Sequence, residues 1–279
     1  MAGHERGAPS ARTVTSLQNE RVKLIRSLEM RKARRETGLF VAEGASILMT
    51  ARDAGWRPTM LAFLAGAAGG GAAAQIARWA IDAHAECLEV SGAVLAKIAA
   101  KDNPQSMLGV FRQRWGELPD PVGIGESQTW LALEEVRDPG NLGTIIRTLD
   151  AVGGSGIILV GNCCDPYARE CVRATMGSIF AVPLVRASRQ DFLQWRARWR
   201  GDVVGTHLAG SEDFRSAAYR GPRLLVMGSE GPGMSPEMAG ACSRLVKIPM
   251  AGRLDSLNLA VATALVLYQI QGPQLKLDN

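Results

Sequence analysis

The sequence has few of the residues that build metal sites and disulfide frameworks. Five cysteines occur among its 279 residues, an odd number, and no two of them are spaced as Cys-x-x-Cys. The histidines His4, His84 and His207 lie far apart in the chain and lack the spacing of metal ligands. We therefore expect no metal site, and thiols that stay reduced as they do in the cytoplasm.

Segments typical of secretion or membrane insertion are also missing. The N-terminal stretch MAGHERGAPSART has no apolar core, so we do not interpret it as a secretory signal. Residues Pro58–Ala77 carry no charge over a length that would span a membrane, but Gly and Ala form the centre of the stretch. Such a centre is too weakly apolar, and too unfavourable for a helix, to cross a bilayer. We expect a strand, a turn and the start of a helix there, and no membrane partner.

Negative charge is scarce in the first part of the chain. Residues 1–115 hold sixteen Lys or Arg and ten Asp or Glu, which gives a net charge of +6. Residues 116–279 have a net charge of −1, so the whole chain has a net charge of +5. A basic run is usually a solvated helix face, but its concentration in one half of the chain favours a domain that faces a polyanion, with nucleic acid as the natural partner. The candidate phosphate contacts are Arg21, Lys23, Arg31, Lys32, Arg34 and Arg35.

The first part of the chain alternates helical and strand patterns. A basic helix is expected over residues 19–36, and strands are expected at 39–42, 60–65, 86–90 and 106–111. The segment after them is rich in Pro and Gly and lacks periodicity, as linkers do. The sequence thus predicts an N-terminal α/β domain over residues 1–115, a linker over 116–128 and a C-terminal domain over 129–279.

The C-terminal domain alternates short apolar strands with helices. The expected strands lie at 129–136, 156–161, 181–185, 202–207, 223–228 and 244–249, and a closing helix is expected over 257–271. This alternation predicts an α/β fold with a mostly parallel sheet that is covered on both faces. Ligands of such sheets bind at the carboxyl ends of the strands. The unusual residues of this sequence fall at those ends.

Three motifs follow strands of this sheet. In EEVRDPGNLGTIIRT, a turn through Asn141 leads into a helix that carries Arg147. In MGSEGPGMS, Glu230 stands inside a glycine-rich turn. In IPMAGRLDSLN, a loop is followed by Ser256 and Asn258, next to the closing helix.

Each motif by itself has a purely structural interpretation. Asn141 can cap the helix that follows it, and Asp255 or Ser256 can cap the closing helix. The glycines at 228, 231 and 233 do not form Gly-x-Gly-x-x-Gly, and no Lys-Ser/Thr pair follows them, so dinucleotide and P-loop sites are poorly supported. Glycines in that turn would let a ligand approach the backbone closely.

Together, the order and spacing of the motifs resemble those of the SpoU (TrmH-like) family of RNA 2′-O-ribose methyltransferases, over Thr129–Gln271. The shared pattern is Asn-x-x-x-x-x-Arg, then Gly-Ser-Glu-Gly-x-Gly, then Ile-Pro-Met-x-Gly-x-x-x-Ser-Leu-Asn. The first part of the chain is similar to that family's small RNA-binding domain. The resemblance implies that the C-terminal domain forms a deep trefoil knot, an exception to the usual unknotted topology, and binds S-adenosyl-L-methionine.

By position, the resemblance assigns cofactor contacts to Thr206, Gly228, Ile248 and Leu257. It implies transfer of a sulfonium methyl group to a ribose 2′-hydroxyl of structured RNA, without a metal, at a site formed by Arg147, Asn141, Glu230, Ser256 and Asn258. Arg147 would reach into the cofactor site of a partner subunit, so the resemblance also implies a homodimer formed by the C-terminal domain. A guanidinium is almost never deprotonated, so Arg147 fits the role of phosphate anchor at least as well as the role of base.

Two other functions fit parts of this pattern. A non-catalytic RNA- or ribosome-binding protein would keep the fold, but it would be expected to have lost Arg147, Glu230 or Asn258, and all three are present. An oxidoreductase with a nucleotide cofactor would need the glycine fingerprint that this chain lacks. The basic N-terminal domain favours ribosomal RNA over transfer RNA as the target. If the basic run is only a solvated face, RNA capture would fall to Arg169 and Arg173.

Overall fold

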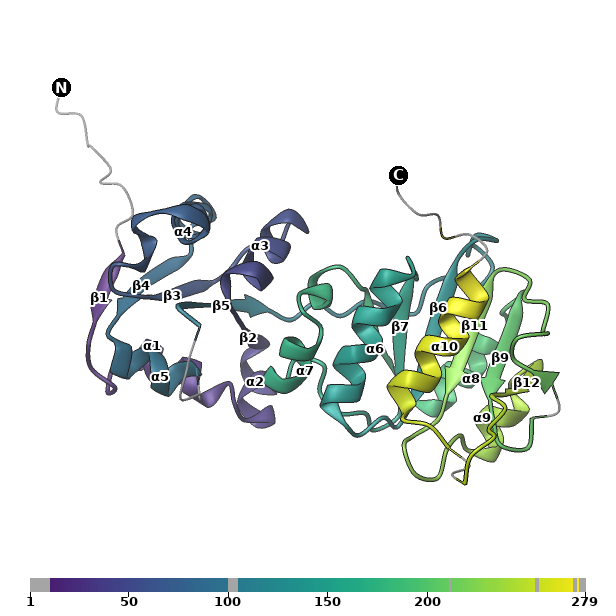
Figure 1. The fold of residues 1–279 in the computed structure, drawn as a ribbon. Coiled ribbons are helices and arrows are strands. Elements are labelled where there is room, and N and C mark those ends of the chain that lie inside the picture. Colours follow the sequence, from purple (N-terminus) through teal and green to yellow (C-terminus); the bar gives the residue numbers. More distant parts are fainter. Residues whose placement is uncertain (1–10, 100–104, 211, 254–255, 273–274, 276–279) are drawn as a thin grey trace. The chain divides into compact units, whose positions relative to one another are not determined.

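The chain forms two compact units in the computed structural model, which describes residues 11–99, 105–210, 212–253, 256–272 and 275 (Figure 1). The first unit comprises Met1–Gln113 together with Tyr167–Phe180, and the second comprises Arg114–Pro166 and Ala181–Asn279. The division after Gln113 lies close to the expected linker. The segment Tyr167–Phe180 lies within the residues that the sequence assigns to the C-terminal domain, yet it packs with the first unit.

A mixed five-stranded sheet is the centre of the first unit. Its strands are β1 (Arg12–Val14), β2 (Leu39–Glu43), β3 (Met60–Leu64), β4 (Glu86–Val90) and β5 (Met107–Arg112), in the order β1-β4-β3-β5-β2. Strands β1, β4 and β3 are parallel, and β5 runs antiparallel to β3 and β2. Helices α1 (Glu20–Ser27) and α5 (Gly92–Ala99) share an apolar core with this sheet through residues such as Val22, Ile25 and Ile98.

The basic run forms two helices, whereas the sequence predicts one. Helix α1 ends at Ser27, α2 spans Arg31–Thr37, and Met30 between them has an extended backbone and a side chain that is 65% exposed. Arg34 fixes this corner, because its Nη1 donates at 2.8 Å to the carbonyl oxygens of both Leu28 and Glu29. The predicted helix breaks because the guanidinium satisfies carbonyl groups that a continuous helix would bond internally.

Aromatic side chains fill the other face of this sheet, beneath α3 (Ala45–Asp53) and α4 (Gly71–Asp82), with the short helix η1 (Ala67–Gly69) leading into α4. Phe40 lies 4.6 Å from Tyr167 and 5.9 Å from Phe180, measured between ring centroids. The indole Nε1 of Trp56 donates to the carbonyl of Phe180 at 2.8 Å. These contacts explain why Tyr167–Phe180, with α7 (Arg169–Ala174) and η2 (Ser178–Phe180), belongs to the first unit.

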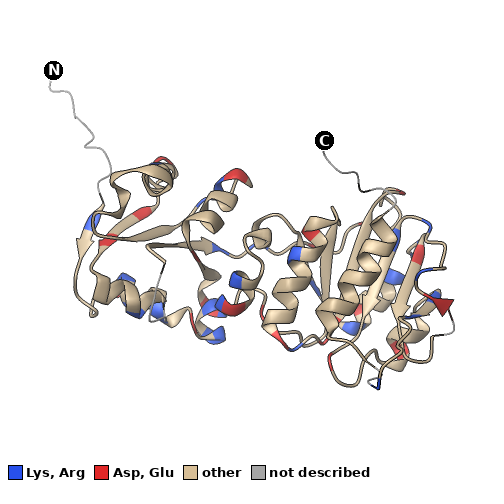
Figure 2. Ribbon diagram, viewed as in Figure 1, with Lys and Arg blue, Asp and Glu red and all other residues tan. Residues whose placement is uncertain are grey.

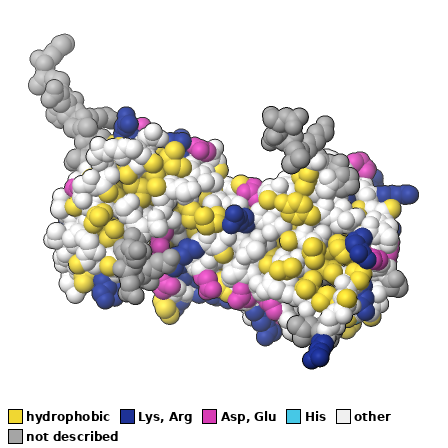
Figure 3. Space-filling model, viewed as in Figure 1, with side chains coloured by type: hydrophobic (Ala, Val, Ile, Leu, Met, Phe, Trp, Pro, Cys, Tyr) yellow, Lys and Arg dark blue, Asp and Glu magenta, His cyan; other side chains and the backbone are white. Residues whose placement is uncertain are grey.

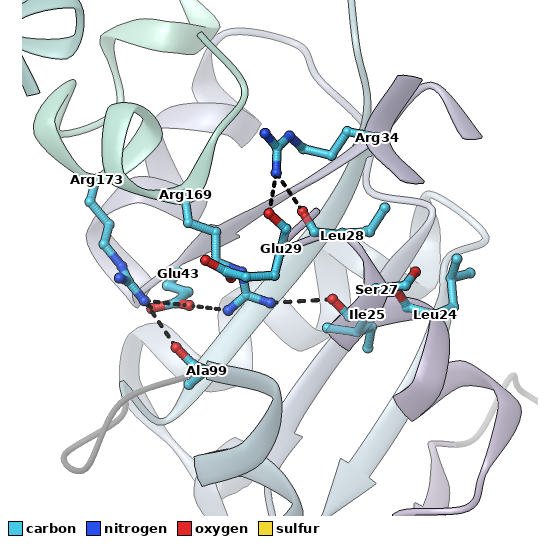
Figure 4. Close-up of polar contacts among 10 residues, drawn as sticks. All are labelled: Leu24, Ile25, Ser27, Leu28, Glu29, Arg34, Glu43, Ala99, Arg169 and Arg173. Atoms are coloured by element: carbon cyan, nitrogen blue, oxygen red, sulfur yellow. Dashed lines mark hydrogen bonds and ion pairs between the residues drawn. The ribbon is translucent and has the colours of Figure 1, made fainter. Parts of the chain in front are cut away.

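An ion-pair cluster completes the attachment of α7 (Figure 4). Arg169 Nη1 lies 2.8 Å from Glu43 Oε1, and Arg173 Nη2 lies 2.8 Å from Glu43 Oε2. Arg169 also pairs with Glu29 at 2.9 Å. Arg169 is 4% exposed, so the suggestion that Arg169 and Arg173 capture RNA is corrected: both are engaged with Glu43 inside the first unit.

The second unit is built on a seven-stranded sheet, and all of its strand pairs are parallel. The strands, in sheet order, are β10 (Glu212–Asp213), β12 (Arg244–Lys247), β9 (Asp202–Thr206), β11 (Arg223–Met227), β6 (Thr129–Glu134), β7 (Gly156–Val160) and β8 (Leu184–Ala187). The predicted parallel α/β fold is confirmed. The strand expected at 181–185 begins at Leu184, because Phe180 and the residues before it belong to the first unit.

Helices cover both faces of this sheet. Helices α6 (Pro139–Ala151) and α10 (Leu259–Gln271) pack against each other on one face (Figure 1). Side chains of α8 (Arg189–Arg196) and α9 (Pro236–Gly240), including Phe192, Trp195 and Met238, pack against alternate residues of the strands such as Trp130 and Val226. Strands buried on both faces account for their nearly continuous apolar sequences.

Three expectations concern the whole chain, of which the structure describes only part. The predicted knot depends on the loop before α10, where residues 254 and 255 lie outside the described residues, so the knot stays a prediction. Among the described helices, none combines the length and the apolar character needed to cross a bilayer. Within the same ranges, no three His, Cys, Asp or Glu side chains are grouped as metal ligands would be.

Candidate functional site

A cavity of about 380 Å³ lies at the carboxyl ends of three neighbouring strands, β9, β11 and β12. Thr206 ends β9, Gly228 follows β11, and Ile248 follows β12; all three residues line the cavity. Leu257, from the segment before α10, lines it as well. These are the four residues to which the family resemblance assigns cofactor contacts. The parallel sheet brings Thr206, Gly228 and Ile248 together because its strands end at one edge.

The glycine-rich turn forms one wall of this cavity. The backbone N–H of Ser229 donates to the carbonyl of Gly233 at 3.0 Å, which closes the turn, and Gly233 has a φ of +74°. A Cβ atom at Gly228 would overlap the backbone of Gly233 and Met234. Gly228 therefore allows two stretches of backbone to approach more closely than a side chain would permit, and the turn presents main-chain groups to the cavity.

Glu230 extends from the turn toward the segment that follows β6. Its carboxylate accepts hydrogen bonds from the backbone N–H groups of Arg137 and Asp138, each at 3.1 Å, and from Asn141 Nδ2 at 3.3 Å. Burial raises the pKa of Glu230, but the backbone and amide donors outweigh this effect and hold its pKa below the ordinary value. Glu230 is therefore an anionic tether at neutral pH rather than a proton carrier.

Asn141 also bonds to the start of α10. Its Oδ1 accepts a hydrogen bond from Asn258 Nδ2 at 2.9 Å, and Asn258 Oδ1 accepts from the backbone N–H groups of Ala260 and Val261. Glu230, Asn141 and Asn258 thus join three segments that lie far apart in the sequence. The N-caps differ from those predicted. Asp138 caps α6 in place of the expected Asn141, and Asn258 caps α10 in place of the expected Ser256. The alternative cap Asp255 lies outside the described residues.

The structure brings most of the predicted catalytic residues to this site, but not Arg147. Glu230 and Ser256 line the cavity, Asn141 donates a hydrogen bond to Glu230, and Asn258 donates one to Asn141. Arg147 lies on the exposed surface of α6 and is not part of the cavity wall. Its side chain makes no hydrogen bond or ion pair with any residue that the structure describes. A single copy of the second unit therefore does not place Arg147 beside the predicted cofactor residues.

A second cavity, of about 530 Å³, lies on the outer face of α6 and α10. Thr144 and Thr148 of α6 contribute to its wall, and they lie on the same helix face as Arg147. The apolar side chains that α10 presents there are Val261, Leu265 and Tyr268, which are 40–50% exposed. An apolar helix face with this exposure is typical of a surface that another protein covers.

The cavity also contains residues that the sequence analysis did not single out. Met227, His207 and Lys247 line it beside the predicted residues. Met227 precedes Gly228, His207 follows Thr206, and Lys247 precedes Ile248. Their positions at the ends of predicted strands could have identified them from the sequence. Thr206 Oγ1 contacts Met227 Sδ at 3.2 Å, which connects β9 with β11 at the floor of the site.

The proposed phosphate contacts of the first unit belong to the basic positions coloured blue in Figure 2, and they differ in their exposure. Arg31, Lys32 and Arg35 are exposed on α2. Arg21 and Lys23 are about half exposed and pair with Glu86 and Glu20. Arg34 is 4% exposed and is occupied by backbone carbonyls, so its assignment is corrected to a structural one.

Two protein families match this chain, one in each part of it. Residues 128–268 match the SpoU rRNA Methylase family, and residues 19–109 match an MRM3-like substrate binding domain. The MRM3-like match ends before the expected linker, residues 116–128, and the SpoU match begins at its last residue.

Individual relatives match across nearly the whole chain. A Synechocystis protein described as an uncharacterized tRNA/rRNA methyltransferase is 31% identical over 94% of each chain. The 23S rRNA (uridine(2479)-2′-O)-methyltransferase of Streptomyces viridochromogenes is 29% identical over 94% of this chain and 92% of its own. The crystal structure of an AdoMet-bound rRNA methyltransferase from Sinorhizobium meliloti superposes with a TM-score of 0.88, at 44% identity, over 95% of this chain and 99% of that one.

Proposed function

Because this chain belongs to the SpoU rRNA methylase family, we propose that it transfers a methyl group from S-adenosyl-L-methionine to a ribose 2′-hydroxyl of structured RNA. Ribosomal RNA is the expected target, since the Streptomyces relative is named for a 2′-O-methylation of 23S rRNA. The observation that carries the proposal is the cavity at the ends of β9, β11 and β12, where Thr206, Gly228, Ile248 and Leu257 converge.

The residues of this cavity fit S-adenosylmethionine. Its volume lies within the range of about 300–1,000 Å³ that is typical of small-molecule sites. Ile248, Leu257 and Met227 provide apolar contacts for an adenine ring, and the main chain of the turn after Gly228 provides hydrogen-bonding groups. When bound, the cofactor supplies the electrophilic methyl group, and the protein supplies alignment of the attacking hydroxyl.

Arg147 acts on the RNA in this proposal. A guanidinium holds a phosphate through two parallel N–H donors and stays charged at any physiological pH. Anchoring the phosphate next to the target ribose would fix the direction of the 2′-hydroxyl without any need for Arg147 to accept a proton. Its freedom from hydrogen bonds and ion pairs within the described residues leaves all of its donors available for this role.

Glu230, Asn141 and Asn258 hold the site together in this proposal. Glu230 ties the cofactor turn to the start of α6, and Asn141 ties α6 to the start of α10. Arg147 lies on α6, so the same network sets the orientation of the helix that carries it. Ser256, which lines the cavity next to Leu257, is exposed and faces the space where the ribose would enter.

The site is completed by a second copy of this chain. Arg147 is outside the cavity of its own unit, but it shares a helix face with Thr144 and Thr148, which line the second cavity. Hydrophobic side chains gather on this surface of the second unit (Figure 3). Two copies that bury Val261, Leu265 and Tyr268 against each other would bring α6 of one subunit to the other subunit. A two-fold arrangement of this kind is the commonest oligomer, and it makes both sites equivalent.

The first unit binds the RNA in this proposal. It matches the MRM3-like substrate binding domain, and Arg31, Lys32 and Arg35 are exposed on α2. Contacts from such side chains to phosphates give affinity without sequence readout. The selection of one nucleotide is then left to the shape of the RNA and to the cavity of the second unit.

Calorimetry tests the cofactor assignment. We expect S-adenosylhomocysteine to bind with one site per chain and NAD not to bind; the opposite result would favour a nucleotide-dependent oxidoreductase. Methyl transfer to RNA that is isolated from a strain lacking the gene, followed by mapping of 2′-O-methyl positions, tests the reaction. Binding of S-adenosylhomocysteine without any methyl transfer would favour a non-catalytic RNA-binding protein.

Mixed dimers test whether Arg147 acts across subunits. Arg147→Ala removes the anchor, and Gly228→Ala displaces the cofactor turn, because its Cβ atom would overlap the Gly233 backbone. Each variant alone should be inactive. A mixture should regain up to about a quarter of the wild-type rate per chain, because in mixed dimers one of the two sites combines an intact turn with an intact Arg147. A mixture with no activity, or a monomer by light scattering at micromolar concentration, would contradict the shared site.

A further inference from the structure

A buried carboxylate holds the glycine-rich turn from outside the cavity. Glu134, the last residue of β6, is 2% exposed. Its Oε2 accepts a hydrogen bond from the backbone N–H of Ser235 at 2.7 Å. Its Oε1 accepts from Arg189 Nε at 3.0 Å and lies 2.9 Å from Arg189 Nη2. Both oxygens of this buried charge have partners, which offset the cost of removing it from water.

Ser235 lies directly after the turn. It follows Gly233 by two residues, and its Oγ accepts a hydrogen bond from the Met238 N–H at 3.3 Å as the N-cap of α9. Gly233 and Met234 line the cavity. The hydrogen bond from Ser235 to Glu134 therefore fixes the point at which the turn leaves the cavity and enters a helix.

Glu230 makes the complementary connection in the opposite direction. Glu230 lies in the turn and accepts from Arg137 and Asp138 after β6, whereas Glu134 lies on β6 and accepts from Ser235 after the turn. Two carboxylates thus tie the same two segments at two points. With both ties in place, the turn can neither move away from β6 nor slide along it.

The backbone between these two ties is strained. Glu135 has a φ of +49°, a left-handed conformation that is uncommon for a residue other than glycine. Its N–H donates to the Val160 carbonyl at 3.0 Å, and its carboxylate lies 3.6 Å from Arg189 Nη2. Strain of this kind persists where the surroundings hold the chain firmly, and it concentrates at binding sites.

We propose that Glu134 is a positioning residue for methyl transfer: its carboxylate holds the turn over residues 228–235 in the shape that binds the cofactor. The inference rests on the proposed function, because it concerns the same cavity. Glu134 itself touches neither cofactor nor RNA. Arg189 supports it by balancing its charge from the start of α8.

Cofactor affinity and steady-state kinetics of the full-length protein test this role. Glu134→Ala should weaken the binding of S-adenosylhomocysteine roughly ten- to hundredfold, the range expected for losing a hydrogen bond to a charged group. The KM for S-adenosylmethionine should rise by a similar factor, while the KM for RNA stays unchanged. Glu134→Gln should recover most of the affinity, because its amide oxygen can still accept from the Ser235 N–H.

Arg223→Met is a matched control at the amino end of β11, opposite the edge that carries the cavity. Arg223 is buried at the start of β11 and donates to the Ser127 carbonyl at 2.7 Å, away from the cavity. It should lower the Tm without changing the affinity of the folded protein for S-adenosylhomocysteine. The inference is overturned if folded Glu134→Ala binds with wild-type affinity, or if Arg223→Met weakens binding equally. A wild-type protein that does not bind S-adenosylhomocysteine would overturn the proposed function itself, so the two failures are distinguishable.

Discussion

Two arginines of the first unit and one arginine of the second lie in opposite environments. In the first unit, Arg34 and Arg169 are each 4% exposed and are held by carbonyl oxygens or carboxylates. In the second unit, Arg147 is exposed on α6 and makes no hydrogen bond or ion pair with the described residues. A guanidinium that is already saturated stabilises a fold, whereas one with free donors is available to a substrate. Burial and pairing therefore distinguish arginines that hold the fold from one that remains available for the proposed role.

Glu43 of the first unit and Glu230 of the second are held in different ways. Glu43 in the first unit is paired with Arg169 and Arg173, so two helix side chains neutralise its charge. Glu230 in the second unit is held by backbone N–H groups and an amide, which stabilise its charge without a cation. The first arrangement fastens α7 to β2, and the second shapes a loop that lines a cavity.

Replacing Arg147 should produce the largest effect on activity. Arg147→Ala should lower kcat by roughly 10²–10³-fold, comparable to the loss of a donor that stabilises charge at a reaction centre. Because Arg147 makes no hydrogen bond or ion pair with the described residues and lies outside the cavity wall, the Tm and the affinity for S-adenosylhomocysteine should stay at wild-type values. Single-turnover kinetics and calorimetry would measure both. Arg147→Lys should fail too, since an ammonium cannot reproduce the planar fork.

Arg198→Ala is the matched control for that experiment. Arg198 is an exposed arginine of the second unit, with a long ion pair of 3.5 Å to Asp120. It should retain wild-type turnover. An Arg147→Ala protein with wild-type turnover would show that free donors on α6 are not used by the substrate.

Replacing Arg169 should affect stability rather than activity at the cofactor site. Arg169→Met leaves Glu43 buried with only Arg173 as partner, and breaking a buried pair costs about 3–5 kcal/mol. Hydrogen exchange should increase in peptides from α1, β2 and α7, while the affinity for S-adenosylhomocysteine remains unchanged. Unchanged exchange in these peptides would contradict the structural role of the Glu43 cluster.

The exposed arginines and lysine of α2 should affect RNA affinity and its salt dependence. A variant that replaces Arg31, Lys32 and Arg35 with alanine should lower the log–log salt slope by about 0.7–0.9 for each lost phosphate contact. Arg34 is kept, because its removal would open the corner between α1 and α2. Filter binding at several salt concentrations would measure the slope. A wild-type slope in this triple variant would mean that α2 is only a solvated face.

The pH dependence of cofactor binding should be the smallest effect. The pKa of Glu230 is lowered in the folded protein, so the stabilisation that it contributes is fully present above its unfolded pKa of about 4.3 and is lost as the pH falls through the folded value. Affinity for S-adenosylhomocysteine should therefore be flat between pH 8 and pH 5, as calorimetry can measure. A decline centred near pH 6–7 that persists in His207→Gln, which removes the only imidazole among the described residues that line this cavity, would show that Glu230 is not the anionic tether described above.

Local sequence patterns predicted the parallel sheet and the residues of its carboxyl edge. Apolar strands at regular intervals place Thr206, Gly228 and Ile248 at strand ends, and parallel strands bring their ends together wherever the helices lie. The pairing of Asn141 with Asn258 was not predictable from the residues, because 117 positions separate them and only the packing of α6 beside α10 makes them neighbours.

Sequence by itself determined the alternation of strands and helices, the glycine-rich turn and the excess of positive charge in the first part of the chain, because these depend on local periodicity and composition. Tertiary structure alone decided which of the candidate charges are buried and paired. It buried Arg34 and Arg169 against partners and left Arg147 exposed, and it joined Glu134 to Ser235 across 101 positions. Burial and long-range hydrogen bonding depend on which segments the fold brings together, and the sequence around one residue does not contain that information.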